Sequence, residues 1–149
     1  MYDEILLPTD GSPAAAAALD HALDLASTYG ARLHALYVVD VNAYATVETG
    51  GDMVLQALER EGETAVDKVR EAAADAGVEV TTTVETGNPY REILGYIEDE
   101  DVGLVVMGTH GRRGLERFLL GSVTERVVRS ADVPVLTVRE TEEEEEAEE

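Results

Sequence analysis

Three glycines and a serine, spaced as Gly-x2-Gly-x9-Gly-Ser, are the residues of this chain best suited to chemistry. They are Gly108, Gly111, Gly121 and Ser122. The first pair follows an apolar run at 102–107 that predicts a buried strand, and the second pair opens a stretch that predicts a helix. Glycine lets the backbone approach a ligand closely, and a helix start offers unpaired N–H groups and a positive dipole end. The spacing suits a nucleotide or another phosphorylated small molecule, although the same glycines would also serve plain turns.

The spacing matches neither of the two common phosphate-binding motifs. A P-loop needs a lysine directly after its last glycine, and the only lysine, Lys68, lies far away in the chain. A dinucleotide fingerprint needs GxGxxG, which is absent. Phosphoryl transfer needs positioned metal and charge stabilisation, and the sequence shows no obvious general-base pair. We therefore expect a binding protein with slow or no hydrolysis, rather than an efficient enzyme.

Composition limits the class of protein further. The chain has 149 residues, which is most simply one domain, and no cysteine, which excludes disulfides, thiol catalysis and thiolate zinc sites. There is no apolar run long enough for a transmembrane helix. Asp3 and Glu4 stand where a signal peptide would carry basic residues. We expect a cytoplasmic protein.

The chain is strongly acidic, with 32 acidic residues, 11 basic residues and a net charge of −21. Residues 140–149 are mostly glutamate, and such a like-charge run predicts a disordered tail after a domain at 1–139. The acidic body should repel DNA and anionic membranes, so neither is an expected partner. An acidic, lysine-poor surface suits a halophilic source, and an ordinary acidic mesophilic protein is the alternative.

Strand-like and helix-like segments alternate along the chain. Strands are predicted at 4–8, 32–39, 78–85, 102–107 and in a segment that ends near 138. Helices are predicted from 12–13 to 30, and at 54–76, 90–98 and 122–131. Ser12-Pro13 and Asn88-Pro89 each supply a capping side chain and a proline preset for the first helical turn. This alternation predicts an open, parallel, doubly wound α/β sheet, which binds ligands beyond the carboxyl ends of its strands, at the topological switch point.

The motifs together resemble the ATP-binding branch of the universal stress protein family. The resemblance is carried by ILLPTDGS at 5–12, VVD at 38–40, the glycine–serine motif and PVLTV at 134–138, in this order. It implies a single-domain, Rossmann-like fold with strand order 3-2-1-4-5 and helices on both faces. It also implies ATP, Mg²⁺ held mainly by the phosphates, and a homodimer that pairs through the last strand.

The strand order would bring together the ends of the first and fourth strands, and the resemblance nominates the nucleotide-binding residues there. These are Pro8, Thr9, Asp10, Val38, Met107, Gly108, His110, Gly111, Arg112, Gly121, Ser122, Val123 and Thr124. Some have ordinary alternatives. Asp10 could form an Asx turn, Ser122 could cap the helix in a capping box with Glu125, and Thr124 could face solvent. His21 and His34 are interpreted as structural.

The function that the resemblance implies is an ATP-binding, nucleotide-dependent sensor or regulator of the stress response. Two alternatives stay open. One is a weak ATPase or phosphotransferase that uses the same pocket, and the other is a nucleotide-free, dimeric interaction module. The loop at 40–52 follows the carboxyl end of a strand, so it is a candidate lid.

Overall fold

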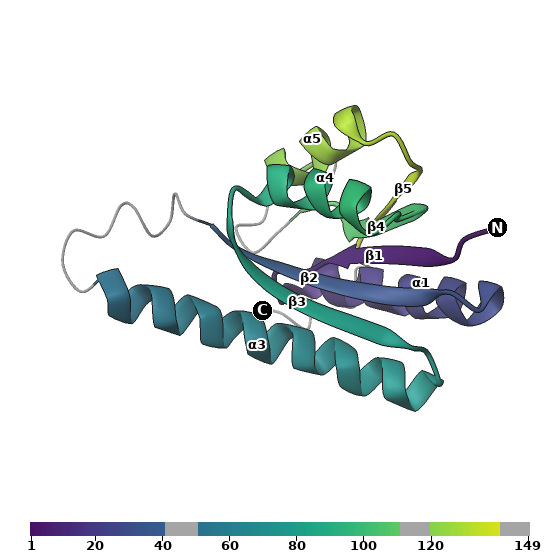
Figure 1. Cartoon of the computed structure of the whole chain (residues 1–149), viewed down its shortest axis with the longest axis horizontal. Coiled ribbons are helices and arrows are strands. Elements are labelled where there is room, and N and C mark those ends of the chain that lie inside the picture. Colours follow the sequence, from purple (N-terminus) through teal and green to yellow (C-terminus); the bar gives the residue numbers. More distant parts are fainter. Residues whose placement is uncertain (41–50, 111–119, 141–149) are drawn as a thin grey trace.

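The computed structural model describes residues 1–40, 51–110 and 120–140, which form a parallel sheet between two layers of helices (Figure 1). The strands are β1 (Glu4–Pro8), β2 (Arg32–Asp40), β3 (Val80–Gly87), β4 (Leu104–Gly108) and β5 (Val135–Val138). The helices are α1 (Pro13–Tyr29), α3 (Gly51–Ala76), α4 (Pro89–Asp99) and α5 (Ser122–Ser130).

The sheet has the predicted order, β3-β2-β1-β4-β5, and each neighbouring pair is parallel. In the centre, Leu6 of β1 lies between His34 of β2 and Val105 of β4. The chain therefore leaves β1 on one side, through β2 and β3, and returns on the other side through β4 and β5. This reversal puts the topological switch point between the carboxyl ends of β1 and β4, which is where such sheets bind ligands.

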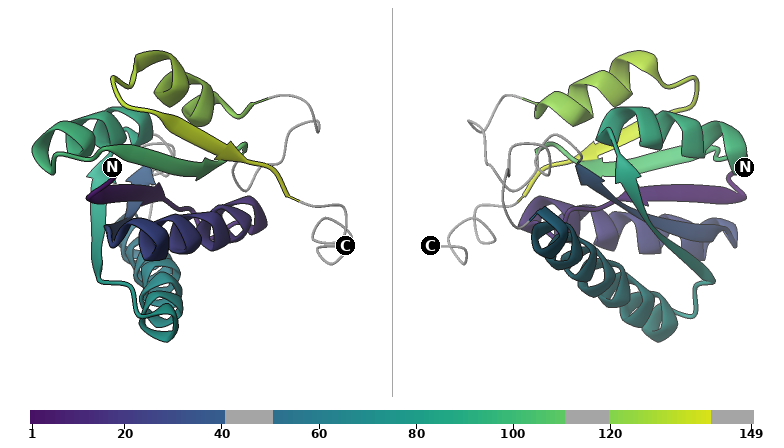
Figure 2. Two further views of the ribbon diagram at one scale, coloured as in Figure 1. Left: turned by 90° about the vertical axis from the view of Figure 1, so that its right-hand side faces the viewer. Right: turned by 60° about the vertical axis from the view of Figure 1, so that its left-hand side comes forward.

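Helices cover both faces of the sheet (Figure 2). One face packs with α1 and α3 in a core that includes Leu7, Val66 and Val106. The other face packs with α4 and α5 in a core that includes Leu6 and Val127. Consecutive residues of β1 thus serve opposite layers, which explains why the strand is an unbroken apolar run rather than an alternating one.

The helix starts follow the predicted combination of a cap and a proline. The Ser12 hydroxyl accepts a hydrogen bond from the Ala15 amide at 3.2 Å, and the Asn88 side chain accepts one from the Arg91 amide at 3.5 Å. Pro13 and Pro89 are the first helical residues. These local signals fix where α1 and α4 begin, and both starts lie at the carboxyl end of the sheet.

Two strands begin later than the sequence predicts. β3 begins at Val80, because the Val78 amide donates to the Ala73 carbonyl at 2.9 Å and so closes α3 instead of joining the sheet. β4 begins at Leu104, because the Val102 amide donates to the Ile97 carbonyl at 3.0 Å and closes α4. In both cases the apolar residue before the strand completes a helix end, which periodicity alone does not reveal.

A glycine within α3 explains how closely this helix approaches the sheet. A Cβ at Gly62 would lie 2.7 Å from Tyr37 Cδ1 and 3.0 Å from Val84 Cγ1. A side chain here would push α3 away from β2 and β3. Glycine therefore stands at this position although it has a low helix propensity. In the described part of the chain, no helix is long and apolar enough to cross a membrane.

Candidate functional site

A cavity of about 510 Å³ opens at the switch point, beyond the carboxyl ends of the central strands. Every predicted site residue that the structure describes lines it: Pro8, Thr9, Asp10, Val38, Met107, Gly108, His110, Gly121, Ser122, Val123 and Thr124. The other two, Gly111 and Arg112, lie outside the described residues. The volume falls in the range typical of small-molecule sites.

The cavity also has walls that sequence spacing did not predict. The additional lining residues are Ala15, Leu36, Tyr37, Val39, Asp40, Leu58, Pro89 and Ile93. Those on β2 flank Val38 and could have been found from that neighbour. Leu58, Pro89 and Ile93 come from α3 and α4, and their place over the strand ends depends on helix packing, for which the sequence offered no signal.

Gly108 forms the floor of the cavity where β4 meets the start of α1. A Cβ at this position would lie 2.8 Å from the Ala14 Cβ and 2.9 Å from the Ala14 carbonyl carbon. Real side chains essentially never approach backbone so closely, so only glycine lets α1 begin here. The Gly108 carbonyl accepts a hydrogen bond from the buried Thr124 hydroxyl at 2.9 Å. Thr124 thus ties α5 to β4 and does not face solvent.

Gly121 holds the start of α5 against the end of β4. Its amide donates to the Thr109 carbonyl at 2.7 Å, and a Cβ here would lie 3.2 Å from the His110 Cα. Gly121 is itself the N-cap residue of α5, without a side-chain cap bond, and its carbonyl accepts from the Glu125 amide at 2.9 Å. The backbone beside His110 therefore leaves little room for a larger residue than glycine.

The prediction that Ser122 caps this helix is wrong. Ser122 is the first residue of α5, one position too far along to act as the cap, and the capping box with Glu125 does not form. The Ser122 side chain lines the cavity instead. The first-turn amides of a helix have no intrahelical partner, so the start of α5 offers N–H groups and a positive dipole end at the cavity wall.

Asp10 forms the Asx turn and lies at the cavity. Its Oδ1 accepts a hydrogen bond from the Ser12 amide at 2.9 Å, which is the Asx turn, and Asp10 also lines the cavity. The neighbouring Thr9 amide donates to the Leu36 carbonyl at 2.9 Å, and the Thr9 hydroxyl accepts from the Gly11 amide at 3.2 Å. These bonds hold the β1 end in a fixed position at the cavity.

His110 is paired with the carboxylate of Glu140, a residue that the sequence predicts to belong to the disordered acidic tail. Its Nε2 lies 3.1 Å from Oε1 of Glu140, and the exposed fractions of the two side chains are 17% and 2%. Glu140, the first residue of the glutamate run, is therefore buried and not a solvated tail residue. Residues 141–149 lie outside the described residues.

The two arginines of α5, Arg126 and Arg129, contact neighbouring side chains of the protein. The Arg126 guanidinium lies 4.6 Å from the centre of the Tyr90 ring, and Arg129 pairs with Glu125 at 2.8 Å on the exposed helix face. The hydrogen bond from Arg91, with Arg126 nearby, lowers the pKa of the Tyr90 hydroxyl. Three further arginines that precede α5 in the sequence, Arg112, Arg113 and Arg117, lie outside the described residues.

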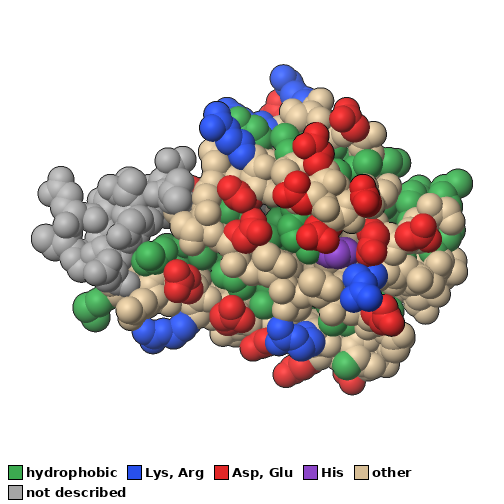
Figure 3. Space-filling view, in the orientation of Figure 1, with side chains coloured by type: hydrophobic (Ala, Val, Ile, Leu, Met, Phe, Trp, Pro, Cys, Tyr) green, Lys and Arg blue, Asp and Glu red, His purple; other side chains and the backbone are tan. Residues whose placement is uncertain are grey.

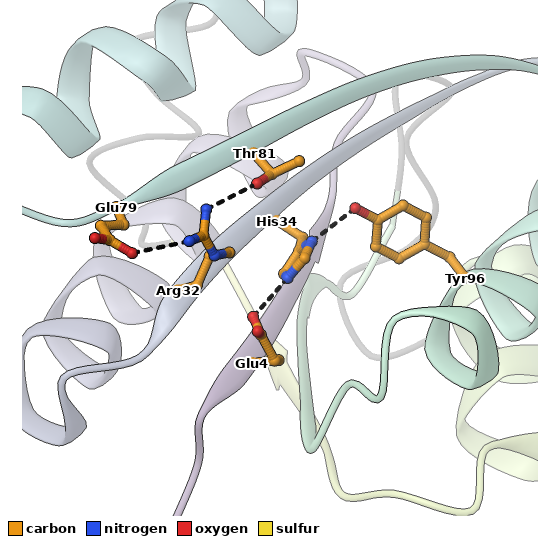
Figure 4. A network of polar contacts seen from close by, with 6 residues as sticks. All are labelled: Glu4, Arg32, His34, Glu79, Thr81 and Tyr96. Carbon is orange, nitrogen blue, oxygen red and sulfur yellow. Dashed lines mark hydrogen bonds and ion pairs between the residues drawn. The ribbon is translucent and has the colours of Figure 1, made fainter.

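His34, near the amino end of β2, lies in a polar network that Figure 4 shows. Its Nδ1 is 2.7 Å from the Tyr96 hydroxyl and its Nε2 is 2.7 Å from Oε2 of Glu4. Burial raises the pKa of the Tyr96 hydroxyl. The His34 ring is buried and bonded at both nitrogens, and it joins β1, β2 and α4. These contacts support the structural role predicted for His34.

A pair of carboxyl groups lies where β3 leads into α4. Burial raises the pKa of Glu85, and so does the hydrogen bond that its protonated carboxyl donates to Glu92. A Cβ at Gly87 would lie 2.5 Å from Oε1 of Glu92, so glycine at this position makes room for the pair. Acidic side chains spread widely over the face of the molecule shown in Figure 3, in keeping with the net charge of −21.

Glu85→Gln is expected to raise the free energy of unfolding near pH 7 by no more than about 0.5 kcal/mol, because solvent still screens a half-buried pair. A raised folded-state pKa means that the folded protein holds the proton more tightly. The stability this contributes is present at low pH and is lost as the pH rises through the raised value. Urea unfolding of both proteins at pH 4 and pH 7 measures the difference. A larger gain at pH 4 than at pH 7 would contradict it.

Within residues 1–40, 51–110 and 120–140, no three histidine or acidic side chains gather in a way that could hold a metal ion. The cavity instead combines apolar walls, the two aspartates Asp10 and Asp40, hydroxyl groups and helix-start amides. Such a surface can hold a flat ring and hydroxyl groups at one end and an anion at the other.

Together, the sheet order and the cavity define a doubly wound α/β protein with a candidate ligand site at its switch point. The model of the family described as "Universal stress protein family" matches residues 1–139. The chain is 40% identical over 141 residues to Universal stress protein MJ0531 of Methanocaldococcus jannaschii, covering 93% of this chain and 83% of that protein. The chain belongs to the universal stress protein family.

Solved structures agree with this assignment. The structure of MJ0577, from the same organism, is similar with a TM-score of 0.85 and 33% identity, over 95% of this chain and 98% of that one. A universal stress protein in complex with cAMP has a TM-score of 0.72 and 22% identity, over 94% of this chain and 99% of that one. This chain and the cAMP-bound protein are therefore similar in fold alone.

Proposed function

We propose that this protein binds an adenine nucleotide, with ATP as the first candidate, in the switch-point cavity and acts as a nucleotide-dependent regulator of a stress response. The observation that carries the proposal is the meeting of Gly108, Gly121 and the start of α5 at one wall of a 510 Å³ cavity. Two close backbone approaches and a helix start form a surface suited to phosphate.

The two ends of the cavity have different chemistry, and this difference orients the ligand. At the β1–β2 side, Pro8, Val38 and Ile93 supply apolar surface for the adenine ring, and the Asp10 carboxylate is placed to accept from ribose hydroxyls. At the β4–α5 side, the Ser122 hydroxyl and the helix-start amides face the phosphates. Gly111 and Arg112, by their sequence position, would extend this phosphate end.

The family supports this class of ligand. The like-folded universal stress protein in complex with cAMP holds an adenine nucleotide. For the present chain the choice of adenine is our inference, and it rests on the apolar wall and on Asp10. Mg²⁺ would arrive with ATP and be held mainly by phosphate oxygens.

We also propose that the protein forms a homodimer through β5. This strand is at the edge of the sheet, so one side of its backbone faces no other strand of the described chain. Leu136 is 38% exposed on it. An apolar edge strand is a surface that proteins tend to cover. Light scattering at high salt should give twice the 16.0 kDa chain mass, and a monomer mass would contradict the dimer.

Calorimetric titration of ATP with Mg²⁺ at high salt tests the proposed ligand, with Gly121→Val as the variant that blocks the site. A side chain at residue 121 meets the His110 backbone at 3.2 Å and displaces the phosphate end. We expect the variant to bind at least about tenfold more weakly, a change of ~1.4 kcal/mol.

Gly103→Ala is the matched control, because a Cβ there meets its nearest atoms, Glu4 O and Tyr2 Cδ1, only at 3.9 Å. Circular dichroism checks that each variant is folded. Equal affinity in the wild type and Gly121→Val would place the nucleotide elsewhere, and no binding by the wild type would remove the nucleotide from the function.

A further inference from the structure

Glu140 is a buried carboxylate, and no other acidic residue in the described part of the chain is fully buried. Only 2% of its side chain is exposed, although it begins a run of glutamates and the chain has a net charge of −21. Burying a carboxylate is costly unless it is bound by a polar partner. The partner that the geometry identifies is His110, which lines the candidate nucleotide cavity.

The contact restrains the orientation of the His110 ring. Its Nε2 lies 3.1 Å from Oε1 of Glu140, and its Nδ1 lies 3.3 Å from the Thr109 hydroxyl. A carboxylate can only accept, so the Nε2 atom carries the proton in this pair. A carboxylate that accepts from one ring nitrogen is the usual means by which proteins fix the tautomer and plane of a functional histidine.

The backbone around the pair is held on both sides. The Thr109 amide donates to the Val138 carbonyl at 3.0 Å, and the Thr109 carbonyl accepts from the Gly121 amide at 2.7 Å. His110 therefore lies between the end of β5, which leads to Glu140, and the start of α5. The His110 Cα is 3.2 Å from where a Gly121 Cβ would be, so the ring belongs to the phosphate end of the cavity.

We propose that Glu140 is a positioning residue of the nucleotide site, which holds His110 so that its ring binds the phosphates. This inference rests on the proposed nucleotide function. Glu140 accepts from Nε2 and keeps the ring in place, so that Nδ1, when it carries a proton, donates to a phosphate oxygen beside the Thr109 hydroxyl. Glu140 itself does not contact the nucleotide, and through His110 it affects only the binding of the phosphate groups.

Glu140→Gln tests this role with a series of ligands that differ only in phosphate number. We expect the variant to bind ATP roughly tenfold more weakly, in line with the loss of such a supporting carboxylate, and adenosine within about twofold of the wild type. Glu98→Gln, an exposed change of the same charge on α4, is the matched control and should leave both affinities unchanged. A parallel loss for adenosine and ATP would show a merely structural role and overturn the proposal.

A double-mutant cycle with His110→Ala shows whether Glu140 acts through His110. We expect His110→Ala to weaken ATP binding about as much as Glu140→Gln, and the double variant to be no weaker than either single one. Additive losses would overturn the proposal, because they would mean that Glu140 acts by another route.

The nitrogen-15 NMR signals of the His110 ring separate this inference from the proposed function. Recorded without nucleotide, the Nε2 signal should be that of a protonated, hydrogen-bonded nitrogen and should shift in Glu140→Gln. Unchanged ring signals would overturn the positioning role even if ATP binds. If the ring signals shift but wild-type protein binds neither ATP nor adenosine, the proposed function fails and the role in phosphate binding fails with it.

Discussion

Gly108→Ala is expected to lower the free energy of unfolding by about 2 kcal/mol and to weaken nucleotide binding, because overpacking at a tight contact shifts backbone. The new Cβ would lie 2.8 Å from the Ala14 Cβ and 2.9 Å from its carbonyl carbon. Backbone atoms cannot rotate away as a side chain can, so α1 and β4 must separate. This separation moves the cavity floor and the carbonyl that Thr124 binds. Urea unfolding and ATP titration measure the two effects.

Gly103→Ala isolates the steric cause of this effect. Gly103 directly precedes the same strand, but a Cβ there finds its nearest atoms only at 3.9 Å. The control should stay within about 0.5 kcal/mol of the wild type and bind ATP normally. If Gly108→Ala were as stable as this control, the close contact between β4 and α1 could not be what requires glycine.

Thr124→Val is expected to lower the free energy of unfolding by about 2 kcal/mol, since it leaves the buried Gly108 carbonyl without its side-chain donor. Valine keeps the shape of threonine and removes only the hydroxyl that donates to Gly108 at 2.9 Å. Because this bond fastens the start of α5 to β4, the nucleotide affinity should also fall. Denaturant unfolding gives the first quantity and calorimetry gives the second.

Thr86→Val provides the comparison on an exposed position of β3. The same chemical change there should alter stability by no more than about 0.5 kcal/mol, as is usual at the surface. A similar loss in both variants would attribute the effect to valine itself rather than to the bond between Thr124 and Gly108.

The fold could be predicted from the sequence because its local signals agree with one another. Ser12-Pro13 and Asn88-Pro89 mark helix starts through side-chain caps, and both caps form. The apolar run of β1 predicts a strand buried on both faces, and Leu6 is fully buried in one of them. The strand order followed from the family resemblance, and no local pattern would have supplied it.

The cavity was predicted in part, for a physical reason. Gly108 and Gly121 are recognisable because close backbone approach requires glycine, and spacing in the sequence shows this requirement. The place of Ser122 at the cavity was predicted, but its capping alternative was wrong, because a capping box and a serine in the first helical turn look alike in sequence and only the backbone angles of Gly121 separate them. Leu58 and Ile93 reach the cavity through helix packing.

Glu140 could not be predicted from its surroundings in the sequence. A glutamate at the head of an acidic run has every local feature of a solvated tail, and its burial depends on β5 ending beside β4. Val138 lies opposite Gly108 in that pair, which brings Glu140 to His110. Of the candidate lid at 40–52, Asp40 ends β2 and residues 51–52 begin α3, while residues 41–50 lie outside the described residues. The predicted site residues Gly111 and Arg112 also lie outside them and remain predictions.

The measurement that tests the central claim most directly is a nitrogen-15 amide NMR titration of the protein with ATP and Mg²⁺ at high salt. The account predicts that the largest shifts fall on the amides of Gly108, Gly121 and Ser122, which line the cavity, while those of Gly95 and Gly103 stay nearly unchanged. Shifts that centre elsewhere, or none at saturating ATP, would contradict an adenine-nucleotide site at the switch point.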